Sequence, residues 1–147
     1  QLAHVASAQG MAVAANIAGH DVVVDYSSVP NVIFTSPEVA SVGLSERSAA
    51  AAGITVRVAK FPFVGNGKAV TMGESEGFVK IIADESGKVV GGSVVGPHAS
   101  DLIAELGLAV SSRMSAEQVA RTIHAHPTLA EAVGEAAEGL FGMAIHI

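Results

Sequence analysis

The sequence contains no cysteine. A chain without cysteine has no disulfide framework, no thiolate metal site and no redox thiol of its own. Tryptophan is also absent, and the aromatic residues are limited to five Phe and one Tyr. The hydrophobic core must therefore be built mainly from Ala, Val and Ile.

Positive charge is scarce. Eight Lys and Arg stand against fourteen Asp and Glu, which leaves a net charge of −6. The first basic residue is Arg47, and no two basic residues are adjacent. Nucleic-acid binding needs a cluster of cations that neutralises several phosphates, so this pattern excludes a nucleic-acid surface.

Long apolar runs are missing as well. Residues 1–20 carry no Asp, Glu, Lys or Arg, but polar residues such as Gln9 and Asn16 interrupt the stretch. It falls short of the ~20 apolar residues that cross a bilayer, and it lacks the basic start of a signal peptide. We expect no membrane segment. Because the chain opens on Gln1 inside a helical pattern, we expect it to be part of a longer protein.

What is present favours one packed domain. Half of the 147 residues are hydrophobic and 15% are charged, which is enough for a core and argues against disorder. Apolar spacing predicts a helix from Leu2 to Gly19, with a possible break near Gly10. The turn-rich residues 27–31 mark a candidate domain boundary. Short strands are predicted at 32–35, 39–43, 54–59, 78–83 and 89–95, with a loop at 65–68.

Helices dominate the last third of the chain. An apolar stripe from Leu102 to Val110 predicts one helix. Ser115 with Gln118, and Thr128 with Glu131, have the spacing of capping boxes that open two more helices. Ser45 is expected to cap a short helix that ends at Gly53. Strands followed by helices predict an α+β fold, in which an antiparallel sheet has its helices packed on one side.

The segment from His124 to Glu131, HAHPTLAE, is the richest in chemistry. Pro127 disfavours a helical conformation at His126, which places that imidazole on a bend. A histidine whose second ring nitrogen is held by a carboxylate can act as a general base near neutral pH. Glu131 could instead only complete the capping box with Thr128. No third ligand at a recognisable spacing supports a metal site, so none is expected.

The same segment resembles a known family. The stretch from Ser115 to Glu131, SAEQVARTIHAHPTLAE, is similar to the C-terminal signature of the dihydrolipoamide dehydrogenases, which are flavin-dependent pyridine nucleotide–disulfide oxidoreductases. Further resemblance runs through residues 29–43, 91–96, 104–105, 2–4 and the tail 141–147. The resemblance implies that residues 1–27 end an FAD-binding domain and that residues 28–147 form the interface, or dimerisation, domain.

The resemblance also assigns roles. His126 would be the catalytic base that takes a proton from a dihydrolipoamide thiol, and Glu131 would orient it. His126 and Pro127, joined by a cis bond, would reach the flavin site of the partner subunit in a homodimer. Ala3 and His4 would lie near the flavin of their own chain, while His124 would be structural.

The parent protein would use FAD and NAD, neither of which is expected on this chain alone, because the redox cysteines and dinucleotide loops should lie upstream. Its partner would be the lipoyl-bearing acyltransferase of a 2-oxo acid dehydrogenase complex. The location would be the bacterial cytoplasm, or the mitochondrial matrix in a eukaryote. Two alternatives stay open: another flavin disulfide reductase, acting on glutathione, trypanothione or mercuric ion, or a chain that serves only in dimerisation and docking.

Overall fold

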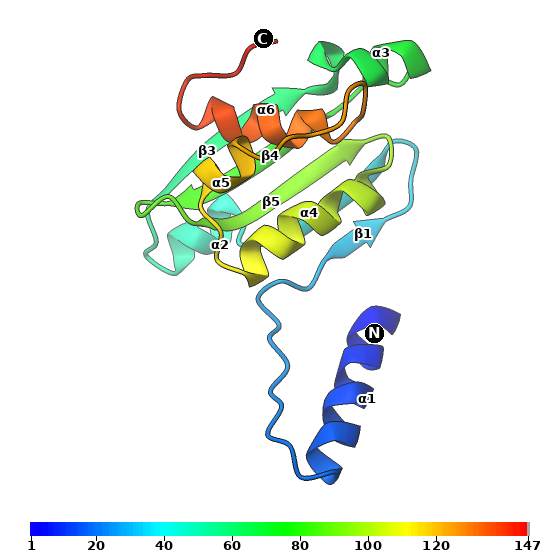
Figure 1. Ribbon diagram of the computed structural model, residues 1–147, viewed down its shortest axis with the longest axis vertical. Helices are drawn as coiled ribbons and strands as arrows, with labels where there is room; N and C mark the ends of the chain where they lie inside the picture. The colour runs from blue at the N-terminus through cyan, green and yellow to red at the C-terminus, as the bar shows by residue number, and fades with distance from the viewer. Residues whose placement is uncertain (147) are drawn as a thin grey trace.

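The computed structural model describes residues 1–146, so Ile147, the last residue of the tail that carries the resemblance, lies outside the described residues. The fold has a sheet body and an N-terminal arm (Figure 1). Five strands form one antiparallel sheet in the order β1-β2-β5-β4-β3. The strands are β1 (Asn31–Ile33), β2 (Glu38–Gly43), β3 (Val56–Pro62), β4 (Phe78–Asp84) and β5 (Val89–Gly96).

The three C-terminal helices are α4 (Ala99–Ser111), α5 (Ala116–Ala120) and α6 (Glu131–Gly139). α4 packs on β2 and β5, while α6 packs on β3 and β4, so these helices cover one face of the sheet (Figure 1). The predicted α+β architecture is confirmed. The core lies between the layers, where Ile81, Ile103, Leu106 and Val133 are at most 2% exposed.

A glycine lets α4 approach the sheet. A Cβ at Gly92 of β5 would lie 2.7 Å from Leu106 Cδ1 and 2.8 Å from the Lys80 carbonyl oxygen. Any larger residue would therefore push α4 away from the strands. The opposite face of the sheet carries the short helix α2 (Glu46–Ala51), whose Glu46 pairs with Lys80 of β4 at 2.8 Å.

Several local predictions are confirmed. Ser45 caps α2 and Ser115 caps α5, each in a reciprocal capping box. The apolar stripe of α4 is buried as expected at Ile103, Leu106 and Val110.

Other local predictions are wrong. Helix α1 (Ala3–Ile17) runs through Gly10 without a break. Residues 65–68 were expected to form a loop, but Gly65 ends a single 3₁₀ turn, η1 (Phe63–Gly65), and residues 67–68 begin helix α3 (Gly67–Met72). Asn66 between them caps that helix. The strand expected at 54–59 begins two residues later and runs on to Pro62, as β3. Its Val58 lies opposite Ile82, on the face away from the C-terminal helices, and is 39% exposed.

The N-terminal arm consists of α1 and the extended connection that follows it, residues 1–30. Ala12 is the buried residue of α1, and the rest of the helix is largely exposed. His4 Nε2 lies 3.0 Å from the Pro30 carbonyl oxygen, and Gln9 donates to the Tyr26 hydroxyl at 2.8 Å. The domain boundary expected at residues 27–28 stays a prediction. Within residues 1–146, none of the helices is both long and apolar enough to span a membrane.

Candidate catalytic base site

The segment between α5 and α6, residues 121–130, carries the predicted base. His124 at its centre is anchored to α4, because its Nε2 lies 2.8 Å from Glu105 Oε1 and its side chain is only 10% exposed. The hydrogen bond to Glu105 outweighs burial and raises the pKa of His124 above its ordinary value. A Cβ at Gly134 of α6 would lie 3.0 Å from His124 Nδ1, so a glycine there makes room for the ring.

His126 and Glu131 are brought together as expected. His126 Nδ1 donates to Glu131 Oε1 over 2.8 Å, and the His126 side chain is 78% exposed. The peptide bond between His126 and Pro127 is cis, as the resemblance implied. With Nδ1 engaged by the carboxylate, Nε2 is the ring nitrogen that can accept a proton from outside.

The second carboxylate oxygen of Glu131 binds the backbone instead of the histidine. Its Oε2 accepts from the Thr128 backbone N–H at 2.8 Å, while the Thr128 hydroxyl donates to the Ala125 carbonyl. The expected capping box is therefore only half formed, because the N-cap position of α6 is Ala130 and Thr128 does not cap it. Orienting the histidine and stabilising the turn are not rival roles for Glu131. Each uses one oxygen.

The electrostatics keep Glu131 ionised. Burial acts to raise the pKa of this carboxyl, but the hydrogen bonds from Thr128 and His126 and the charges of His126 and His146 outweigh it. The pKa of Glu131 is therefore held below its ordinary value. An ionised carboxylate on Nδ1 stabilises the imidazolium that forms when Nε2 takes a proton.

A cavity of about 210 Å³ lies beside the pair, and the C-terminal tail closes one side of it. Buried Glu135 of α6 accepts from the Ile145 N–H at 2.8 Å and also binds His146 Nδ1. That hydrogen bond with Glu135 raises the pKa of His146. The cavity lining includes His124, His126, Glu131, Asn66 and His146.

The remaining predicted site residues lie elsewhere. Ala3 borders a different cavity, of about 580 Å³, at the start of α1, and His4 next to it contacts Pro30. The structure does not bring Ala3 or His4 into the cavity that holds His126. The roles that the resemblance assigns to Ala3 and His4 stay predictions.

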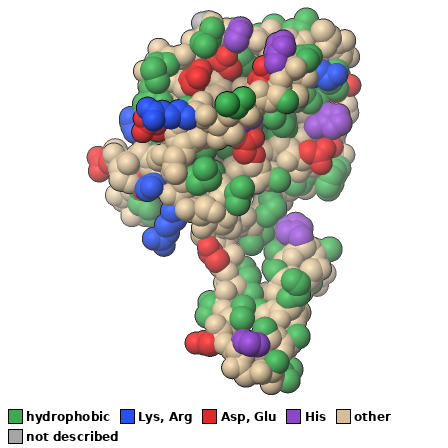
Figure 2. Space-filling model, in the orientation of Figure 1, with side chains coloured by type: hydrophobic (Ala, Val, Ile, Leu, Met, Phe, Trp, Pro, Cys, Tyr) green, Lys and Arg blue, Asp and Glu red, His purple; other side chains and the backbone are tan. Residues whose placement is uncertain are grey.

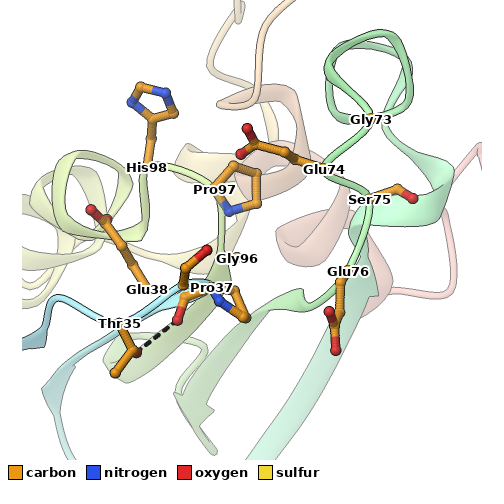
Figure 3. Close-up of a pocket in the computed structure, with 11 residues that line it drawn as sticks. Thr35, Pro37, Glu38, Gly73, Glu74, Ser75, Glu76, Gly96, Pro97 and His98 are labelled. Carbon is orange, nitrogen blue, oxygen red and sulfur yellow. Dashed lines mark hydrogen bonds between the residues drawn. The ribbon is translucent and has the colours of Figure 1, made fainter.

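A third cavity, of about 570 Å³, is acidic (Figure 3). It lies between the β1–β2 turn, the segment after α3 and the start of α4, and its side chains include Glu38, Glu74, Glu76 and His98. Glu38 is already engaged, because it accepts from the Ser100 N–H at 2.8 Å. Across residues 1–146, no group of three or more potential ligands has the arrangement of a metal site.

Three residues at the base site were not predicted from the sequence: Asn66, Glu105 and Glu135. Asn66 carried a usable signal, since asparagine directly before a helix is a common N-cap. Glu105 and Glu135 carried none, because their partners lie 19 and 11 residues away and only the packing of the helices brings them together.

Comparison with known proteins identifies the family of this chain. Residues 29–137 match the family profile described as the dimerisation domain of pyridine nucleotide-disulphide oxidoreductases. The chain belongs to this family. The resemblance noted in the sequence is thereby confirmed, as is its assignment to the dimerisation domain.

Curated relatives and solved structures point to the same family. The chain is 59% identical over 138 residues to a dihydrolipoyl dehydrogenase of Chlamydia muridarum, covering 93% of this chain and 30% of the relative. It is 51% identical over 147 residues to that of Geobacillus stearothermophilus, covering 99% and 31%. The crystal structure of LpdA from Mycobacterium tuberculosis superposes with a TM-score of 0.88 at 34% identity, over 93% of this chain and 30% of that one. The chain thus spans about a third of the length of these relatives.

Proposed function

We propose that this chain is the dimerisation domain of a dihydrolipoamide dehydrogenase and that it supplies the catalytic base, His126, to the partner subunit. The observation that carries the proposal is the hydrogen bond between ionised Glu131 and His126, whose side chain is exposed in the middle of the segment between α5 and α6. The relatives at 47–59% identity share the name dihydrolipoyl dehydrogenase, which favours this activity over other disulfide reductases.

The step assigned to this chain is a proton transfer. His126 Nε2 takes the proton from a dihydrolipoamide thiol, and the S–H electron pair stays on sulfur as a thiolate. Glu131 holds Nδ1–H, so the ring presents its basic nitrogen to the thiol and then carries the positive charge against a carboxylate. When the thiolate has attacked the redox disulfide of the parent protein, the same imidazolium can return its proton to the departing sulfur.

FAD, when bound, would accept the electrons that leave the dithiol. The start of α1 fits a flavin oxygen: within the described residues Leu2 makes no side-chain cap and the first turn holds no carboxylate. The backbone N–H groups near Ala3 and His4 are therefore available to an electron-rich ligand atom at the positive end of the helix.

Residues 1–146 contain no glycine-rich phosphate loop of the kind that binds a dinucleotide. Asn66 lies between η1 and α3 and uses its own side chain to cap the Ala69 N–H, and the Gly65–Gly67 stretch lacks a third glycine. We propose that NAD and the redox cysteines belong to the rest of the parent protein and that this chain alone has no reductase activity.

Homodimerisation and docking of a lipoyl-bearing acyltransferase are part of the same proposal. Large hydrophobic side chains are strongly exposed for a domain of this size, among them Phe34 at 79% and Ile123 at 97%. Figure 2 shows hydrophobic side chains exposed on both the sheet body and the arm. Contact with a second copy would bury such surface and would set His126 beside the partner's flavin.

Hybrid dimers test the proposal. One subunit would carry His126→Gln with intact redox cysteines, and the other an intact His126 with the redox cysteines replaced by serine. If the base acts on the partner subunit, the hybrid regains one working site, although each parent homodimer is inactive. A hybrid as inactive as both homodimers would contradict the proposal.

A further inference from the structure

Asn66 uses both ends of its side-chain amide. Its Oδ1 accepts from the Ala69 N–H at 2.9 Å and so caps α3. Its Nδ2 points the other way and donates to the Thr128 carbonyl oxygen at 3.0 Å, across 62 residues of sequence. Asn66 is 4% exposed, so neither bond is readily replaced by water. The first bond belongs to the fold of α3, whereas the second reaches the segment that carries the base.

Thr128 makes the hydrogen bonds that hold the turn of that segment together. Its N–H binds Glu131, and its hydroxyl binds the carbonyl of Ala125. Both of these partners lie within the segment or at its junction with α6, so they fix its internal shape and not its place on the body. Among the hydrogen bonds of Thr128 within residues 1–146, the bond from Asn66 ties it to a different part of the fold. His126 lies two residues before this point of attachment.

We propose that Asn66 is a positioning residue, whose side-chain N–H holds the His126–Glu131 pair where the base must act. The inference rests on the function proposed above, and it assigns to Asn66 a role beyond helix capping. Without the donor, the Thr128 carbonyl lacks its partner, and the stretch around Thr128 can shift even though His124 stays bound to Glu105 of α4. Such a shift moves the Thr128 N–H and with it the carboxylate that orients His126. Displacements of about 1 Å in a catalytic group can slow a reaction by roughly 10²-fold.

Two substitutions separate the two bonds. Asn66→Asp and Asn66→Ser both keep an oxygen that caps a helix as well as asparagine does, and both remove the amide donor. The Asp variant adds a charge and the Ser variant does not. We would make both in the complete flavoprotein, with His126→Gln as a reference, and measure dihydrolipoamide oxidation, reduction of an artificial acceptor by NADH, and amide hydrogen exchange.

We expect kcat for dihydrolipoamide oxidation to fall roughly 10–100-fold in both Asn66 variants, while acceptor reduction stays unchanged. Amide exchange should accelerate in the peptide that spans residues 125–132, while the peptide that contains α3 keeps its protection. A residue that served only as a cap would leave both readouts at the wild-type value.

The outcomes are distinguishable. Wild-type rates in both variants, beside an impaired His126→Gln, would overturn this inference and leave the proposed function standing. A loss confined to the Asp variant would assign the effect to its charge and would also overturn it. Wild-type oxidation by His126→Gln would overturn the proposed function, and the positioning role with it.

Discussion

His126 and Glu131 lie five residues apart and are joined by a 2.8 Å hydrogen bond from Nδ1 to Oε1, while the other oxygen of the same carboxylate holds the Thr128 N–H. The turn is therefore closed by the same group that orients the ring. Because the carboxylate is fixed by the backbone, the direction in which His126 presents Nε2 is fixed as well. Disturbing the turn and disturbing the base are coupled through one side chain.

That coupling predicts a graded result for substitutions of Glu131. Glu131→Gln retains one carbonyl oxygen, which can keep the Thr128 N–H, but it loses the negative charge beside His126. We expect the free energy of unfolding of Glu131→Gln to change by less than about 1 kcal/mol. Its rate of thiol oxidation should fall by a smaller factor than that of His126→Gln. Glu131→Ala should lose both stability and activity. Thermal unfolding and steady-state kinetics on both variants check this, and equal activity losses in Gln and Ala with wild-type unfolding would refute the division of roles.

The His124–Glu105 pair predicts a pH-dependent contribution to stability. The pKa of His124 is raised above the ordinary value of 6.5 by its hydrogen bond to Glu105 and by the charges of Glu105 and Glu131. A raised folded-state pKa means that the folded protein binds the proton more tightly than the unfolded chain does. The stabilisation is thus complete below pH 6.5 and disappears as the pH rises through the folded-state pKa of His124.

We therefore expect the Tm difference between the wild type and His124→Gln to be largest in mildly acidic buffer and to shrink as the pH rises. The matched control is Glu105→Gln, which keeps His124 but removes the charge, and it should flatten the pH dependence in the same way. A Tm difference that grows with pH would have the wrong sign for this pair.

Two helical glycines form a matched pair for substitution. A Cβ at Gly107 of α4 would meet its nearest neighbours at 4.0 Å, so Gly107→Ala should stabilise the protein by about 0.5–1 kcal/mol through its helix propensity. A Cβ at Gly134 would press on the His124 ring, which is already held by Glu105. Gly134→Ala should show no such gain. Urea unfolding of both variants measures this, and equal stabilisation would mean that the His124 ring is free to move.

Local features of the fold were predictable from the sequence because their causes are local. The apolar stripe of α4 and the caps at Ser45 and Ser115 depend on residues three or four positions apart. The exposure of Val58 was not predictable, since β3 is an edge strand and the face on which Val58 lies depends on its pairing with β4.

The candidate site also has local features that the sequence could predict and long-range contacts that it could not. The spacing of His126 and Glu131 allowed both a cap and a base, and the family resemblance favoured the base. In the structure one oxygen of Glu131 binds His126 and the other binds the Thr128 N–H, and the role of His126 as a base stays a prediction. The contact of Asn66 with Thr128 and that of Glu105 with His124 could not be predicted, because each joins residues that only the packing of α3 and α4 against the base segment brings together.

The most direct test of the account is the ratio of two activities in His126→Gln of the complete flavoprotein. Oxidation of dihydrolipoamide needs the base, whereas reduction of an artificial acceptor by NADH bypasses the thiol. Removal of a general base costs about 10²–10⁴-fold, so the ratio of dihydrolipoamide oxidation to acceptor reduction should fall by that factor. A ratio equal to that of the wild type, whether both activities survive or both are lost together, would contradict the assignment of His126 as the base.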